Sequence, residues 1–262
     1  TNLISIVGED FKPEYLDYFK SRKINIEGIK IHPGKTFHWK GFYEKDMGQA
    51  HTIATDLNVL LEFEPQVPEA IKNTPYIYLG NIDPVQQKKA LQQFTKPKLV
   101  VMDTMNYWIT ETNKELKETL KHIDVLIIND QELRMLTGLD NIIQAMPKAL
   151  EMGPSTIIVK KGENGSIMYN GQTYAIFPAY PLAKLVDPTG AGDSFAGGFI
   201  GYVAAQDDLS FETFKRGIIA GTLMSSFKVQ GFSVEPLAKI DKNKIQHRFE
   251  EMQKWINIPE KI

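Results

Sequence analysis

Four apolar runs of strand length, each followed by polar residues, recur through the middle of the chain. They cover residues 75–81, 98–103, 124–129 and 156–160, and segments with helix-like patterns separate them. Near-continuous apolar strands that alternate with helices are typical of a parallel sheet covered on both faces. The pattern therefore predicts an α/β protein with a mostly parallel central sheet.

The polar residues directly after these runs are candidates for ligand contacts, because ligands bind beyond the carboxyl ends of strands in such sheets. Asn81, Asp103 and Asn106 follow the first two runs and are the candidate substrate contacts. Asn129 and Glu132 follow the third run, but an Asn at a strand end and an acidic residue in a first helical turn are also ordinary capping chemistry. Both interpretations of this pair stay open.

A different pattern covers residues 29–63, where short strand-like runs alternate with turns. Polar and aromatic residues alternate in part of this segment, which favours a small sheet with one face covered. Its aromatic residues could stack on a sugar or a base, pack within the segment or form a dimer contact. They are Phe37, Trp39, Phe42 and Tyr43.

The stretch 185–205 predicts a loop that turns directly into a buried helix. Pro188, Gly190 and Gly192 punctuate the loop, and small and apolar residues then continue to Ala205. A glycine-rich turn at a helix start exposes backbone N–H groups at the positive end of the helix dipole, which suits a phosphate. Asp193 is either an N-cap or a base that takes a proton from an attacking hydroxyl group.

Composition narrows the class of protein. The 262 residues are 42% hydrophobic, which suits one large α/β domain over residues 1–262. The net charge of −2 and the lack of a basic run give no reason to expect a nucleic-acid partner, and the absence of cysteine excludes disulfides and thiolate nucleophiles. With no signal peptide or long apolar span, we expect a cytoplasmic protein without a membrane partner.

The nine residues 187–195, Asp-Pro-Thr-Gly-Ala-Gly-Asp-Ser-Phe, resemble the C-terminal signature of the ribokinase-like (PfkB) family, which phosphorylates sugars and nucleosides with ATP. The resemblance implies a three-layer α/β/α fold, with residues 29–63 as a small β lid over the sugar site. It also implies that Asp193 is the catalytic base and that Gly190, Ala191 and Gly192 form the anion hole.

Other segments resemble further parts of the family's site. Asn129 and Glu132 match an Asn-x-x-Glu motif that orders Mg²⁺ and its waters. The Gly162–Gly165 turn resembles one beside the nucleotide, although Lys160 stands where the family has a threonine, and the loop around Gly231 resembles the adenine site. Asp187 and Thr189 resemble part of a monovalent-cation loop, which implies K⁺.

The chain begins with Thr1, and the family's N-terminal strand with its Gly-Gly motif has no match, so we expect a shortened N-terminus. The resulting hypothesis is a kinase that uses ATP and Mg²⁺ to phosphorylate a hydroxymethyl group of a small sugar. A purine nucleoside kinase is one alternative, because the lid is aromatic. A nucleotide- or sugar-binding protein without turnover is another, and a homodimer through the lid is the predicted assembly.

Overall fold

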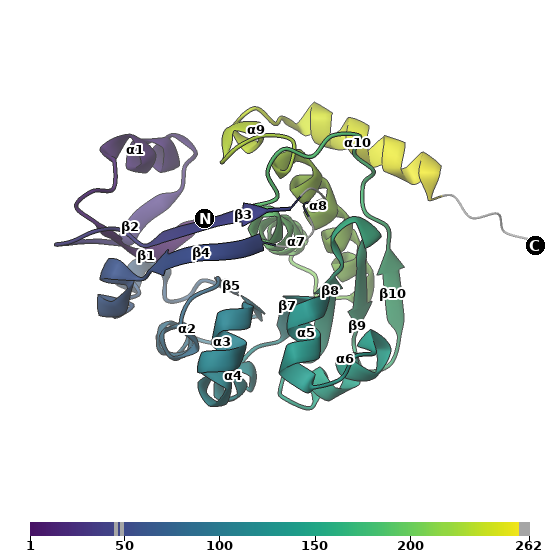
Figure 1. Cartoon of the computed structure of the whole chain (residues 1–262), viewed down its shortest axis with the longest axis horizontal. Coiled ribbons are helices and arrows are strands. Elements are labelled where there is room, and N and C mark those ends of the chain that lie inside the picture. Colours follow the sequence, from purple (N-terminus) through teal and green to yellow (C-terminus); the bar gives the residue numbers. More distant parts are fainter. Residues whose placement is uncertain (45–46, 48–49, 257–262) are drawn as a thin grey trace, which may run out of the picture. The chain divides into compact units, whose positions relative to one another are not determined.

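The computed structural model describes residues 1–44, 47 and 50–256, which form two compact units (Figure 1). Of the described residues, the first unit contains those within 1–77 and 82–98, and the second contains 78–81 and 99–256. Residues 45–46 and 48–49 of the predicted lid lie outside the described residues, as do residues 257–262.

The first unit is built from two small sheets and short helices. Its elements are β1 (Asn2–Gly8), α1 (Pro13–Ser21), β2 (Asn25–His32), β3 (His38–Tyr43), β4 (Ala50–Asp56), η1 (Asn58–Glu62), η2 (Glu69–Ile71) and α2 (Pro84–Leu91). Strands β1 and β2 are parallel, and β3 and β4 are antiparallel. Ile6, Val59 and Phe63 form a buried cluster in this unit. The predicted lid segment is therefore divided, because its first residues belong to β2 and pair with β1.

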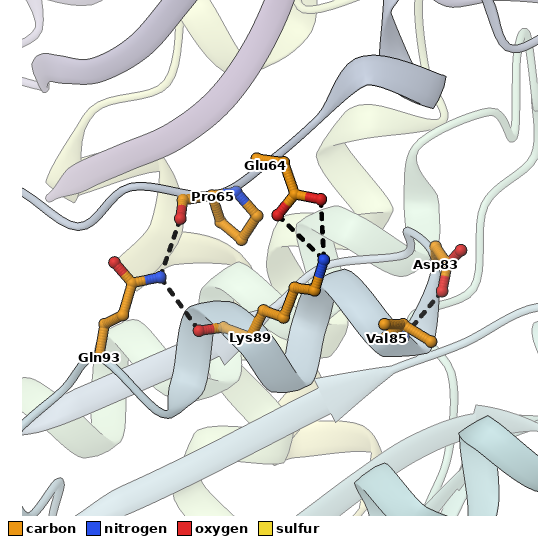
Figure 2. A network of polar contacts seen from close by, with 6 residues as sticks. All are labelled: Glu64, Pro65, Asp83, Val85, Lys89 and Gln93. Carbon is orange, nitrogen blue, oxygen red and sulfur yellow. Dashed lines mark hydrogen bonds and ion pairs between the residues drawn. The ribbon is translucent and has the colours of Figure 1, made fainter.

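A polar network attaches α2 to the extended chain before it (Figure 2). The side-chain amide of Gln93 donates to the carbonyl oxygens of Pro65 and Lys89, at 2.8 and 3.1 Å, and its own oxygen accepts the N–H of Val67 at 3.0 Å. Lys89 also pairs with Glu64 at 2.8 Å. One side chain thus satisfies several backbone groups that would otherwise lose their hydrogen bonds on burial.

The second unit contains most of a six-stranded sheet with the order β10-β9-β8-β7-β6-β5. The strands are β5 (Tyr76–Leu79), β6 (Leu99–Asp103), β7 (Val125–Asn129), β8 (Thr156–Lys160), β9 (Ser166–Tyr169) and β10 (Tyr174–Phe177). Strands β6, β7 and β8 are parallel, whereas β9 and β10 continue the sheet as antiparallel hairpins. The four predicted strands are confirmed. In this register Asn129 lies beside Lys160, at the carboxyl ends of two neighbouring strands.

Helices cover both faces of this sheet and complete the predicted three-layer α/β/α arrangement. They are α3 (Asn106–Glu111), α4 (Asn113–Leu120), α5 (Asp130–Thr137), α6 (Ile142–Leu150), α7 (Ala191–Gln206), α8 (Phe211–Lys228), α9 (Glu235–Ala238) and α10 (Lys242–Trp255), with the short turn η3 (Gly162–Asn164) after β8. In Figure 1, α5 and α6 lie on the near side of the sheet and α8 on its far side. Within residues 1–44, 47 and 50–256, no helix combines the length and apolar character needed to cross a membrane.

Gly198, in the run of small residues after Asp193, has a packing reason. A Cβ atom on Gly198 would lie 2.8 Å from the Cα atom of Gly221, so α7 and α8 approach each other at backbone distance. Larger side chains at these two positions would force the helices apart.

Candidate active site

The turn before α7 is formed by Gly190, which has a φ angle of +81° and is the N-cap residue of the helix. Glycine adopts this left-handed conformation at little cost, whereas a residue with a Cβ atom is strained there. The Gly190 carbonyl accepts both the N–H and the hydroxyl of Ser194, at 3.0 and 2.8 Å, and the N–H of Ala191 donates to the carbonyl of Pro188 at 3.0 Å. The turn is therefore held by hydrogen bonds on both sides of Gly190.

Asp193 lies exposed in the first turn of α7 and does not cap it. The N-cap residue is Gly190, and no side chain of the described residues forms a capping hydrogen bond to α7. The interpretation of Asp193 as an N-cap is therefore wrong. The N–H groups of Gly192 and Asp193 have no acceptor within the described part of the chain, which places two unpaired donors and a carboxylate at the positive end of a 16-residue helix.

Lys160 brings a positive charge to the same turn. It is the last residue of β8, and a Cβ atom on Gly192 would lie 2.8 Å from its ammonium nitrogen. The glycine therefore leaves room for the lysine side chain directly beside the start of α7. The end of β8 and the start of α7 thus bring together an ammonium group and two backbone N–H donors, and all of these groups favour binding of an anion.

Asp103, at the end of β6, is 5% exposed and lies within the same cluster of charges. Its Oδ2 atom accepts the hydroxyl of Tyr78 at 3.2 Å and lies 3.9 Å from the ammonium nitrogen of Lys160. Burial raises the pKa of Asp103 to about 7, even though Lys160 acts to lower it, and the nearby carboxylates of Asp193 and Glu132 raise it further. Burial, followed by the charge of Asp103, also raises the pKa of Tyr78 well above 10.

Asn129 and Glu132 form a capping box at the start of α5. The Asn129 Oδ1 atom accepts the N–H of Glu132 at 2.8 Å, and the Glu132 Oε2 atom accepts the N–H of Asn129 at 2.9 Å. Capping chemistry is therefore present at this pair. Burial raises the pKa of Glu132, although the hydrogen bond from Asn129 and the charge of Lys160 oppose this rise.

The chemistry of this pair also fits Mg²⁺, which prefers oxygen ligands and usually keeps several of its waters. One carboxylate and one amide oxygen lie at the end of β7, beside Lys160. In the described residues, no group of three or more His, Cys, Asp or Glu side chains is arranged to hold a metal ion. The role of Asn129 and Glu132 in holding Mg²⁺ stays a prediction.

Asn81 and Asn106 lie exposed after β5 and β6. The Asn81 carbonyl oxygen accepts the indole N–H of Trp108 at 2.9 Å, so the end of β5 is attached to α3. Asn106 begins α3, and its side-chain oxygen accepts the N–H of Tyr107 at 2.9 Å. The structure places both asparagines at the carboxyl edge of the sheet, and their contact with a substrate stays a prediction.

The Gly162–Gly165 turn joins β8 and β9 as a hairpin, as predicted. Both glycines have positive φ angles, +55° and +78°, and the N–H of Lys161 donates to the carbonyl of Gly165 at 2.8 Å. A Cβ atom on Gly165 would overlap the carbonyl oxygen of Phe177. Backbone geometry therefore accounts for these glycines, and their contact with a nucleotide stays a prediction.

Lys228 was not predicted as part of the site. It ends α8, is 4% exposed, and its ammonium nitrogen lies 3.5 Å from Oδ2 of Asp187. Burial acts to raise the pKa of Asp187, but hydrogen bonds from Thr189 and Lys228 outweigh it, so this pKa lies below the ordinary 3.8. A lysine in the last turn of a helix is common because it complements the helix dipole, so the sequence contained no signal for this contact.

Comparisons with known proteins show which family and which solved structures the chain resembles. A family model described as pfkB family carbohydrate kinase matches residues 1–234. The chain is 31% identical to the cytidine kinase of Thermococcus kodakarensis over 211 residues, which cover 76% of this chain and 72% of that protein. It is 28% identical to the ribokinase of Lactococcus lactis over 200 residues, covering 76% and 64% of the two chains. The crystal structure of a Methanocaldococcus jannaschii nucleoside kinase matches 95% of this chain and 80% of its own, with a TM-score of 0.75 and 24% identity.

Proposed function

The chain belongs to the pfkB family of carbohydrate kinases, and from this premise we propose that it transfers the γ-phosphoryl group of ATP to the hydroxymethyl group of a nucleoside. The chain is a small-molecule kinase, as its named relatives are. The observation that carries the finer proposal is the start of α7, where two unpaired N–H groups and the exposed carboxylate of Asp193 lie together.

In this proposal Asp193 is the general base. It accepts the proton of the hydroxymethyl group while the hydroxyl oxygen forms a bond to the γ-phosphorus, and the bond from that phosphorus to the bridging oxygen of ADP breaks. The N–H groups of Gly192 and Asp193 stabilise the charge on the phosphoryl oxygens. Gly190 and Ala191 act through the shape of the turn, because the Ala191 N–H is already donated to Pro188.

Lys160 complements the phosphate charge from the side of Gly192. Its ammonium group also lies near the buried Asp103, so we propose that Asp103 and Tyr78 position this lysine. The turn with Gly162 and Gly165 and the loop at Gly231 remain the predicted nucleotide contacts. The family has a threonine hydroxyl group at the position of Lys160. In this proposal the positive charge of the lysine takes the place of that hydroxyl group.

Asn129 and Glu132 would hold Mg²⁺, partly through water. When bound, the ion neutralises charge on the phosphates of the nucleotide. Glu132 can keep its capping bond during this role, because that bond uses only Oε2.

The choice of a nucleoside as the acceptor is supported by the relatives. A cytidine kinase and a nucleoside kinase are among them, and nucleosides present the hydroxymethyl group of a ribose ring. The first expectation from the sequence was a free sugar, and a ribokinase relative of similar coverage keeps ribose as the second candidate. Asn81, Asp103 and Asn106 are the predicted contacts to either acceptor.

The test is ADP release with Mg-ATP against cytidine, inosine, adenosine, ribose and fructose. We expect turnover with a nucleoside, and we expect Asp193→Asn to lower kcat by about 10² or more because the base is lost while its shape is kept. Glu212→Gln, an exposed carboxylate on α8, is the matched control. Near-normal turnover of Asp193→Asn would refute the assigned base. ATP binding without ADP release for any acceptor would favour a binding protein instead.

We also propose the predicted homodimer through the lid. Strands β3 and β4 form an isolated two-stranded sheet, which is marginally stable by itself, and Phe42 and Ile53 on it are 51% and 58% exposed. Size-exclusion chromatography with light scattering on the wild type and on Ile53→Lys tests this. A monomeric wild type at all concentrations would exclude the dimer.

A further inference from the structure

Lys228 carries a charge in a place where water does not reach it. The residue is 4% exposed, and three oxygen atoms of the second unit surround its ammonium nitrogen. These are the carboxylate of Asp187 at 3.5 Å, the carbonyl of Asp187 at 3.2 Å and the carbonyl of Gly231 at 3.5 Å. A buried ammonium is costly unless such partners compensate for lost water, so the arrangement is a built site for one positive charge.

This charge connects two loops that both belong to the proposed kinase site. Asp187 begins the turn that leads to α7, and its Oδ1 atom accepts the N–H of Thr189 at 3.0 Å. Gly231 follows α8 and is a predicted nucleotide contact. The N–H of Val186 also donates to the carbonyl of Val229 at 2.8 Å, so the two loops are joined by backbone bonds next to the lysine.

The lysine also reaches the glycine that shapes the anion-binding turn. A Cβ atom on Gly190 would lie 3.5 Å from the Cε atom of Lys228, which is ordinary contact distance. The end of the Lys228 side chain thus lies beside the turn that precedes the unpaired N–H groups of Gly192 and Asp193. Removing the charge would leave a mostly buried carboxylate and two carbonyl oxygens without their cation.

All three partners of Lys228 are oxygens, which is also the ligand set of a small monovalent cation. The resemblance to the family implies such a cation at Asp187 and Thr189. We propose that the ammonium group of Lys228 is a resident cation that takes this place and holds the turn before α7 in its active shape. Phosphoryl transfer by this chain then needs no added K⁺. The inference rests on the proposed function, and Lys228 is a positioning residue because it acts through the turn.

The test compares two variants that remove the same charge but leave different space. Lys228→Ala opens room for a small ion beside Asp187, whereas Lys228→Met fills most of the space of the lysine without its charge. Lys215→Ala on the same helix is the control, because Lys215 pairs with the exposed Glu212 and with no other carboxylate in the described part of the chain. Turnover and the thermal midpoint are measured in K⁺, NH₄⁺ and choline salts at equal ionic strength.

We expect the wild type and Lys215→Ala to show the same kcat in all three salts. Lys228→Ala should lose roughly 10- to 100-fold in kcat in choline and recover most of it in K⁺ or NH₄⁺, since a displaced turn misplaces the catalytic groups. Lys228→Met should show the same loss of kcat in choline, and K⁺ or NH₄⁺ should not restore it. Activation of the wild type by K⁺, or a Lys228→Ala variant that is fully active in choline, would overturn the inference.

Thermal unfolding gives a readout that does not depend on the reaction. K⁺ should raise the midpoint of Lys228→Ala and leave the midpoints of the wild type and Lys228→Met unchanged. If that pattern holds but no acceptor supports turnover, the resident cation stands and the proposed function fails. If turnover is found but K⁺ stabilises and activates the wild type, the function stands and the resident cation is wrong.

Discussion

Asp103→Asn is the substitution that most directly tests the electrostatics of the site. Asp103 is 5% exposed, and burial raises its pKa from 3.8 to about 7 in the folded chain. Between pH 3.8 and about pH 7, Asp103 is therefore protonated in the folded protein but has lost its proton in the unfolded chain. The resulting stabilisation is complete below about pH 4 and is lost as the pH rises to about 7. Asparagine has nearly the shape of the protonated carboxyl group and does not titrate, so the Asp103→Asn variant does not lose this stabilisation as the pH rises.

The magnitude follows from the same pKa values. A change from 3.8 to about 7 corresponds to about 4 kcal/mol, at 1.36 kcal/mol for each tenfold change in the dissociation constant. This value refers to the change between pH 4 and pH 8, and it already contains the attraction between Asp103 and Lys160, which acts to lower the same pKa. We expect Asp103→Asn to be about 1–4 kcal/mol more stable than the wild type at pH 8 and of similar stability near pH 4.

Denaturant unfolding at a series of pH values from 4 to 8.5 measures this difference. The free energy of unfolding of the variant minus that of the wild type is the informative quantity, because titrating groups that do not interact with Asp103 cancel in it. Glu212→Gln, which removes an exposed carboxylate, should show no such dependence on pH. A variant that is several kcal/mol less stable than the wild type at pH 8 would show that Asp103 is a stabilising anion paired with Lys160 and would refute the reasoning.

Three further substitutions separate roles that overlap in the structure. Gly192→Ala places a Cβ atom 2.8 Å from the Lys160 ammonium and should displace this flexible side chain, lowering kcat/KM for ATP by about tenfold with little change in thermal midpoint. Glu132→Gln keeps a capping partner but removes the charge, so stability should be retained while the Mg²⁺ concentration for half-maximal turnover rises by about tenfold. An unchanged Mg²⁺ requirement would leave Glu132 as a cap alone. Gln93→Ala should lower the free energy of unfolding by about 1–3 kcal/mol in denaturant titrations, because the N–H of Val67 loses its acceptor, whereas an exposed Gln172→Ala should not.

Local structure was readable from the sequence wherever one residue type settles a backbone conformation. Continuous apolar runs located β6, β7 and β8, because a strand buried on both faces has no polar position. The turn with Gly190 located the start of α7, because only glycine adopts its φ angle at low cost. Residues 187–195 also carried the resemblance to the kinase family, which the family model over residues 1–234 confirms.

Only the tertiary structure decided which groups form ion pairs or hydrogen bonds with each other. Lys228 and Asp187 are 41 positions apart and meet only because α8 ends beside the turn before α7. The raised pKa of Asp103 depends on its burial, and its hydroxyl partner comes from another strand. The sequence also left open whether Asp193 caps α7 and whether Asn129 and Glu132 cap α5, since both interpretations use the same residues. Spacing along the chain specifies backbone geometry, whereas contacts between distant segments depend on how the sheet and helices pack.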